Sequence, residues 1–282
     1  EYLLRWSERL GLSTKPPSKS KSVIWIHAVS VGEVNASIPL LRNLIDNYPN
    51  ASILVTTTTP TGSKLLMESL GNKVKHKYIL IDIPFFINIF LDKWKPSILI
   101  LLETEIWPNI IYQCKKRWIY TALVNARLSS KSKDNYSRFS SLIKPAIESL
   151  DIILAQFESD KKRFLELANP NEINICGNLK FDQDVPSELE DISATIRQDW
   201  SIDGENRFTL IAASTHDGEE YIVLESVKPI LKKHPHALLI VVPRHLERFE
   251  KVKKIIRDSG LRMASRSKKI EVDPQTQVLL GD

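Results

Sequence analysis

The sequence predicts an α/β protein built on doubly wound, parallel sheets. Short apolar runs of strand length alternate with stretches whose apolar residues recur at helical spacing. This alternation breaks at a polar region, residues 183–206, and then starts again. At 282 residues the chain is long enough for two cores, and its 43% hydrophobic and 26% charged residues are typical of a globular protein. We therefore expect two Rossmann-like domains in series with a cleft between them.

The first domain is expected over residues 23–182, behind an N-terminal segment, 1–22. In that segment Leu3, Trp6 and Leu10 have helical spacing among basic residues, and a proline- and serine-containing linker follows. Such a helix can lie on an anionic membrane surface or pack on its own domain. Helices are expected between the strands, for example at 62–70 and 160–168. The strands themselves are expected at 23–27, 51–57, 77–81, 97–102, 119–124, 151–155 and 172–176.

The second domain is expected over residues 207–282, after a junction at 183–206. Its strands are expected at 208–213 and 237–242, with short ones near 261 and 277. Helical patterns cover 217–233 and 246–259.

Charge and cysteine content exclude some classes of protein. A formal charge of +5 favours an anionic partner without identifying it. A nucleic-acid-binding module would depend on that charge alone, because the clusters at 115–117 and 161–163 lack an aromatic stacking stripe and are typical of solvated helix faces. Cys114 and Cys176 lie too far apart in sequence for a disulfide framework or a zinc motif. No run of 18 apolar residues predicts a membrane span.

Phosphate-binding motifs are weak. The chain has no GxGxxG pattern, which excludes a dinucleotide fingerprint. The segment from Thr59 to Lys64 resembles a phosphate loop only superficially, because it lacks the Gly-Lys-Ser/Thr order. A capped helix start is the favoured interpretation there, although an anion at that helix N-terminus stays possible.

Glu33 lies where the first strand gives way to a helix, in the stretch HAVSVGEV from His27 to Val34. With Ser30 it fits the S-x-x-E pattern of a capping box. Loops at the carboxyl ends of parallel strands also hold ligands, so a catalytic role is the alternative. Pro39 would lie inside a helix begun at Ser30, so we expect the regular helix to start later, near Asn35 or Ser37.

Two more carboxylates, Glu103 and Glu105, follow an apolar strand in LLETEIWPN. Unlike environments for the two would separate acid and base roles, whereas the structural alternative is that one of them caps the helix begun near Pro108. Lys180 follows another strand; it is either a solvated surface lysine or a cation that offsets charge on a departing phosphate.

Two turns of the second domain carry groups suited to a phosphate-bearing ligand. They are AASTHDGEE at 212–220 and VPRH at 242–245, each between a strand and a helix. The turns would lie side by side if their strands pair, and together they supply hydroxyls, an imidazole and a guanidinium. Singly, Ser214, Thr215 and Asp217 are equally good helix caps.

In this order the motifs resemble those of the Kdo transferases, which are bacterial 3-deoxy-D-manno-octulosonic-acid transferases of lipopolysaccharide inner-core synthesis. The resemblance runs from residue 27 to residue 249. The motifs that carry it are HAVSVGEV, TTTTPTGS, ETEIWPN, NARLS, GNLKFD, AASTHDGEE and VPRHLERF.

The resemblance implies a GT-B glycosyltransferase with an acceptor-binding first domain and a donor-binding second domain. Such an enzyme moves Kdo from CMP-Kdo to the lipid A precursor at the cytoplasmic face of the inner membrane, with inversion and without a metal or other cofactor. It implies Glu33 as general base and Glu103 and Lys180 as transition-state stabilisers. Pro243 and Arg244 match positions that contact CMP.

The sequence also departs from the family pattern. The residues given include neither the family's N-terminal membrane anchor nor its later Met-Gly-Glu turn and Asn-Pro-Leu-Glu segment, and we expect both ends of the sequence to be cuts. We therefore expect an incomplete donor domain, with weak or no CMP-Kdo binding and little activity. The alternative enzyme is a nucleotide-sugar epimerase of the same fold, acting on a soluble sugar.

Overall fold

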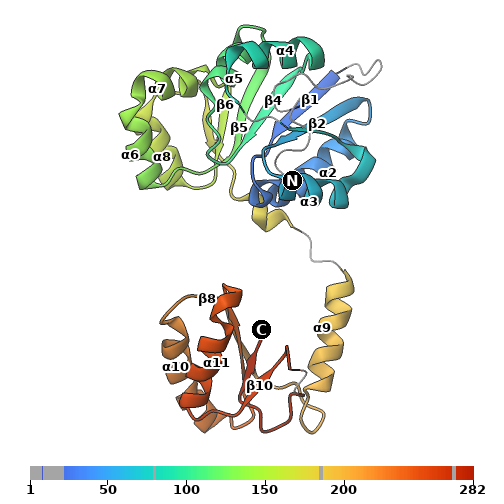
Figure 1. The fold of residues 1–282 in the computed structure, drawn as a ribbon, viewed down its shortest axis with the longest axis vertical. Coiled ribbons are helices and arrows are strands. Elements are labelled where there is room, and N and C mark those ends of the chain that lie inside the picture. The colour runs from blue at the N-terminus through green and yellow to red at the C-terminus, as the bar shows by residue number, and fades with distance from the viewer. Residues whose placement is uncertain (1–7, 9–21, 79–80, 184–186, 269–270) are drawn as a thin grey trace. The chain divides into compact units, whose positions relative to one another are not determined.

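The computed structural model of the chain describes residue 8 and residues 22–78, 81–183, 187–268 and 271–282. The amphipathic helix expected around Leu3, Trp6 and Leu10 lies outside these residues. The chain divides into two compact units, Glu1–Asp184 and Val185–Asp282. Each unit has its own parallel sheet, so the predicted doubly wound α/β class is confirmed (Figure 1).

The first unit contains a seven-stranded sheet in the order β3-β2-β1-β4-β5-β6-β7. All six strand pairings are parallel, as expected for strands connected through helices. Each predicted strand is present within a few residues of its expected bounds. The strands are β1 Ser22–His27, β2 Ala51–Thr57, β3 Lys75–Tyr78, β4 Ile98–Leu102, β5 Tyr120–Ala126, β6 Ile152–Ala155 and β7 Ile173–Ile175.

Helices cover both faces of this sheet (Figure 1). One core cluster joins β1, β2 and β4 to α2 and α3, and the other joins β1, β4, β5 and β6 to α4, α5, α7 and α8. Trp25 and Leu41 are among the fully buried side chains. The helices are α2 Val31–Asn47, α3 Pro60–Leu70, α4 Pro84–Trp94, α5 Pro108–Lys115, α6 Ser130–Arg138, α7 Ser140–Ser149 and α8 Glu158–Leu167, with 3₁₀ turns η1 Gly71–Lys73 and η2 Leu179–Asp182.

The expected late start of the first helix is wrong. Helix α2 begins at Val31, with Ser30 as its N-cap, and contains Pro39 in its interior. Buried apolar side chains of α2 on both sides of this proline, including Val34 and Leu41, belong to the core cluster against the sheet. This burial outweighs the hydrogen bond that Pro39 cannot donate. The capped start predicted at Thr59 is confirmed, because the Thr59 hydroxyl accepts a hydrogen bond from the N–H of Gly62.

The second unit contains a four-stranded parallel sheet in the order β10-β11-β9-β8. Its strands are β8 Thr209–Thr215, β9 Leu238–Pro243, β10 Met263–Ser265 and β11 Val278–Leu280. Helices α10 Glu219–Lys233 and α11 Phe249–Asp258 contribute with β8, β9 and β11 to one core, and η3 Leu246–Arg248 precedes α11. The region predicted as a polar junction is not a plain linker. It contains the helix α9, Ser187–Asp199. The apolar spacing did not predict this helix because its residues are mostly polar.

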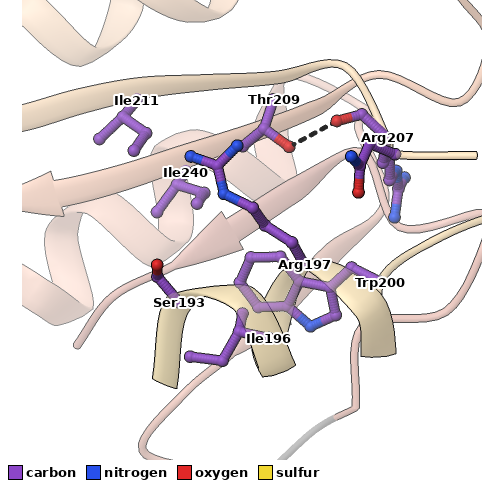
Figure 2. Close-up of a pocket in the computed structure, with 9 residues that line it drawn as sticks. Ser193, Ile196, Arg197, Trp200, Arg207, Thr209, Ile211 and Ile240 are labelled. Atoms are coloured by element: carbon purple, nitrogen blue, oxygen red, sulfur yellow. Dashed lines mark hydrogen bonds between the residues drawn. The ribbon is translucent and has the colours of Figure 1, made fainter. Parts of the chain in front are cut away.

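A cavity of about 360 Å³ lies between α9 and the sheet of the second unit (Figure 2). Ile196, Arg197 and Trp200 line it from the side of α9, and Ile211 and Ile240 line it from the sheet. None of the residues predicted to act in catalysis or CMP binding lines this cavity.

In the part of the chain that the structure describes, no helix combines the length and the apolar content needed to cross a bilayer.

Candidate functional site

The candidate site of the first unit lies where the strand order reverses, between β1 and β4. These neighbouring strands run parallel and pair from Ile24 with Ile98 to His27 with Leu101. Helix α2, which follows β1, packs on one face of the sheet, and α5, which follows β4, packs on the other. Connections that leave to opposite faces open a crevice at the carboxyl edge, where α/β sheets bind their ligands. Glu33 and Glu103 both follow strands that end there.

Glu33 is 6% exposed in the first turn of α2. One carboxylate oxygen accepts a hydrogen bond from the N–H of Val29 at 2.7 Å, and the other accepts one from the Ser30 hydroxyl at 2.8 Å. The Ser30 hydroxyl oxygen in turn accepts from the N–H of Glu33 at 3.3 Å. Capping is therefore a real duty of this pair. It differs from a standard capping box, because the glutamate reaches the N–H of Val29 and not that of Ser30.

The environment of Glu33 also suits a proton acceptor. Burial, followed by the charge of Glu105 and more weakly that of Glu103, raises the pKa of Glu33 from 4.5 to about 7. The hydrogen bonds from Ser30 and Val29 oppose this rise. A carboxyl group with a pKa near neutrality is matched to general-base work at physiological pH.

The two glutamates after β4 are free of the capping role considered for them. Helix α5 begins at Pro108, and Asp82 caps it by accepting hydrogen bonds from the N–H groups of Asn109 at 3.0 Å and Ile110 at 2.9 Å. Glu105 instead accepts a 2.6 Å hydrogen bond from the Trp107 indole, and burial raises its pKa. Glu103 has a left-handed backbone with φ of 55°. Its N–H donates to the Val124 carbonyl in β5, and its carbonyl accepts from the N–H of Arg127, which follows β5.

A buried histidine packs against the partly buried Trp107, whose indole donates to Glu105. The His27 ring at the end of β1 packs edge-on against Trp107, with ring centroids 5.0 Å apart. Its Nδ1 is 2.8 Å from the Thr56 hydroxyl, while Nε2 has no hydrogen-bond partner among the described residues. Burial lowers the pKa of His27 to about 4, so the ring is neutral at physiological pH. Sequence reasoning did not single out His27 or Trp107, since neither carries a motif of its own.

Lys180 lies in η2, on the same unit. The segment packs against α2, because Leu179 joins the core cluster of Val34 and the Gln183 amide donates to the Asn35 carbonyl at 3.1 Å. Lys180 itself is exposed, and its ammonium forms no ion pair with the described residues. The structure therefore brings Glu33 and Glu103 into electrostatic contact and places Lys180 in a turn that contacts the helix of Glu33.

The two turns of the second unit lie side by side, as predicted. Strands β8 and β9 pair in parallel, and the N–H of Arg244 donates to the Thr215 carbonyl at 3.0 Å. His216 and His245, one from each turn, have ring centroids 6.0 Å apart. Pro243 is buried and Arg244 is exposed. The turns thus supply an exposed guanidinium and two imidazoles at one edge of the sheet.

An ion-pair network, which sequence reasoning missed, braces these turns. Glu220 is fully buried and accepts hydrogen bonds from the Thr215 hydroxyl at 2.6 Å and from Arg248 at 2.8 Å. Although burial acts to raise the pKa of Glu220, the bonds from Arg248 and Thr215 hold it below its ordinary value. Thr215 is therefore committed to this network and does not cap α10, whose N-cap is Gly218. No local sequence pattern marked this pair, because Glu220 and Arg248 are 28 residues apart in sequence.

The described residues contain no group of three or more His, Cys, Asp or Glu side chains placed to hold a metal ion.

Comparison with known proteins assigns the chain to a family. A family model described as 3-deoxy-D-manno-octulosonic-acid transferase (kdotransferase) matches residues 4–183. A 3-deoxy-D-manno-octulosonic acid transferase of Haemophilus influenzae is 39% identical over 282 residues, which is 100% of this chain and 65% of that protein. A probable mitochondrial 3-deoxy-D-manno-octulosonic acid transferase of Arabidopsis thaliana is 33% identical over 98% of this chain and 62% of its own length. The chain thus spans just under two thirds of these relatives.

Solved structures confirm the fold. UDP-GlcNAc 2-epimerase from Neisseria meningitidis, bound to UDP-GlcNAc, aligns with 93% of this chain and 72% of its own, at a TM-score of 0.61 and 15% identity. At this identity the likeness shows the fold alone, which is the predicted GT-B type. The family model covers more than half of the chain, and its match contains the ends of β1 and β4, which Glu33 and Glu103 follow. The chain therefore belongs to the Kdo transferase family.

Proposed function

We propose that this chain carries the catalytic residues of an inverting glycosyltransferase that moves Kdo from CMP-Kdo to the lipid A precursor. The observation that carries the proposal is Glu33, a buried carboxyl group with a pKa raised to about 7 at the crevice between β1 and β4. Attack by a sugar hydroxyl on the donor's anomeric carbon needs a base within hydrogen-bond reach. At neutral pH a substantial fraction of Glu33 is ionised and ready to accept that proton.

Glu103 and Lys180 act in the proposal as transition-state stabilisers. The anomeric carbon gains positive character as the bond to the phosphate breaks, which a carboxylate at the crevice stabilises. The departing phosphate gains negative charge, which an ammonium without a competing ion pair stabilises. Family membership and the contact of η2 with α2 support these roles.

Pro243 and Arg244 contact the CMP group of the donor in this proposal. Arg244 is exposed beside His216 and His245, and the pair of the buried Glu220 with the partly exposed Arg248 holds the two turns together. A guanidinium can bind a phosphate through two parallel hydrogen bonds. These cationic and N–H donors perform the charge stabilisation without requiring a metal ion.

The acceptor is lipid-borne, so the proposal includes an anionic membrane surface at the cytoplasmic face of the inner membrane. Support comes from Trp118, which is 92% exposed beside the basic residues Lys116 and Arg117. Exposed tryptophans next to basic side chains are typical of proteins that contact membrane interfaces. Trp118 directly follows the basic cluster at 115–117 in sequence. Two of its charges are already paired, Lys115 with Asp151 and Arg117 with Asp92, which does not favour a nucleic-acid stripe.

The test is a transfer assay with the full-length enzyme, CMP-Kdo and the lipid A precursor, in the presence of EDTA. We expect mass spectrometry to detect acceptor that has gained Kdo, together with an equal amount of released CMP. The matched control is Glu33→Gln, which leaves donor and acceptor binding surfaces otherwise unchanged. An enzyme that epimerises a soluble nucleotide sugar and leaves the lipid acceptor unmodified would overturn the proposal in favour of the epimerase.

A further inference from the structure

We infer that Asn125, Gln156 and Asn178 form a positioning network that fixes the backbone of Lys180, an inference that rests on the proposed function of that lysine. The three side-chain amides come from three successive strand ends, those of β5, β6 and β7. Asn125 belongs to the motif NARLS and Asn178 to GNLKFD, about 50 residues further along the sequence, whereas Gln156 belongs to neither motif.

The hydrogen bonds of the network run in a closed circuit. The Asn125 side-chain oxygen accepts from the N–H of Leu179 at 3.1 Å, and the Asn178 side-chain oxygen accepts from the N–H of Lys180 at 3.0 Å. The Gln156 amide donates to the Asn125 carbonyl at 3.0 Å, and its oxygen accepts from the Asn178 amide at 3.1 Å. Two consecutive backbone N–H groups, those of Leu179 and Lys180, are thereby held by the side chains of Asn125 and Asn178, and Gln156 joins Asn178 to the backbone carbonyl of Asn125.

The network is built into the sheet edge. Asn125 and Gln156 are only 2% and 3% exposed. Asn125 has φ of 56°, in the left-handed region that asparagine tolerates better than most residues, and the pairing of β5 with β6 shifts register between Leu123 and Ala126. This irregularity costs free energy, and it turns the Asn125 side chain toward η2 instead of continuing the ladder.

Few other contacts hold the segment before Lys180. Strand β7 is three residues long and lies at the edge of the sheet, and Gly177 after it has φ of 80° with no atom within 4 Å of an added Cβ. The N–H of Cys176 bonds to the Ala155 carbonyl, and the Leu179 side chain reaches the core. The three side-chain amides therefore fix the position of the Lys180 backbone. That position sets the region that the Lys180 ammonium can reach.

One side-chain atom distinguishes positioning from direct substrate binding. The Asn125 Nδ2 is buried and has no hydrogen-bond partner among the described residues. Its solvent-inaccessible position leaves the oxygen, bonded to Leu179, as the functional end of this side chain. In this inference Asn125 acts through the Lys180 segment, which its oxygen holds at Leu179, and it is therefore a positioning residue.

The experiment is a double-mutant cycle in the full-length enzyme with Asn125→Gly, Lys180→Ala and the double variant. Glycine keeps the left-handed backbone and removes only the amide. We expect Asn125→Gly to lower kcat at least tenfold with little change in the KM of CMP-Kdo, because a misplaced transition-state group costs rate and not ground-state binding. In the Lys180→Ala background the same change should alter kcat less than twofold.

A control removes another side-chain amide, that of Asn171, which precedes the amino-terminal end of β7. Asn171 donates to the carbonyls of Glu148 and Leu150, so Asn171→Gly loses two side-chain hydrogen bonds, one more than Asn125→Gly loses. We expect it to lower the melting temperature but to leave kcat unchanged. Equal losses of kcat in the two glycine variants would show a merely structural role and overturn the inference.

Hydrogen exchange separates a failure of the inference from a failure of the proposed function. We expect the amides of Leu179 and Lys180 to lose at least tenfold protection in Asn125→Gly and none in Asn171→Gly, whether or not the enzyme transfers Kdo. Unchanged protection would overturn the inference. Fully additive losses of kcat in the double variant would overturn it too, whereas an inactive wild type or a fully active Lys180→Ala would refute the proposed function and leave the exchange result to decide.

Discussion

Replacing Glu33 with glutamine separates its capping duty from its proposed catalytic one. Glutamine has nearly the same shape, and its carbonyl oxygen can still accept from the N–H of Val29. It cannot ionise. If Glu33 is the general base, we expect the transfer rate to fall by about 10²–10⁴-fold, which is the usual contribution of a positioned base.

The effect of this change on stability follows from the raised pKa. The folded state binds the Glu33 proton more tightly than the unfolded chain does. The contribution of this protonation to the free energy of unfolding is therefore fully present below pH 4.5 and is lost as pH rises through about 7. A rise from 4.5 to about 7 corresponds to about 3 kcal/mol at pH 8. Glutamine avoids this cost. For a unit of this size we expect a melting temperature several degrees above wild type at pH 8 and no difference at pH 4.

The assays are CMP release and thermal unfolding, each over pH 4 to 9. The control is Glu105→Gln, which removes a charge that raises the Glu33 pKa but leaves Glu33 itself. It should shift the acid limb of the rate profile to lower pH while keeping most of the rate. An unchanged transfer rate in Glu33→Gln, with a lowered melting temperature at pH 8, would refute the reasoning and leave capping as the sole role.

Three further outcomes follow from contacts in the two units. Ser30→Ala removes a donor that lowers the Glu33 pKa, so the acid limb of the rate profile should move to higher pH, while Ser129→Ala, a cap of α6, should not move it. Asp82→Ala removes both caps of α5 and should cost about 1–2 kcal/mol in urea unfolding, against little change for the exposed Asp92→Ala; equal midpoints would contradict the capping role. Glu220→Gln should lower the melting temperature of the second unit, since it removes the main charged partner of Arg248, and an undisturbed melting curve would show that Asp217 suffices.

Periodicity and turn chemistry made the strands predictable. Apolar runs such as 97–102 exclude solvent on both faces, and their bounds in the structure differ by a residue or two. The sequence pattern mispredicted the start of α2 and missed the helix α9. Pro39 argued against an early helix start, but burial of α2 on both sides of it prevailed. The helix α9 escaped because its composition is mostly polar.

The candidate site divides in the same way. The sequence by itself determined which residues stand at strand ends, because strand ends follow from local pattern: Glu33, Glu103 and Lys180 each follow an apolar run. Only the tertiary structure decided which strand ends are neighbours. The pairing of β1 with β4 places Glu33 near Glu103 and Glu105, which raises the pKa of Glu33. Asp82, 26 residues before Pro108, caps helix α5, so neither glutamate has to cap it. Desolvation and charge coupling depend on distances in space, which local sequence does not encode.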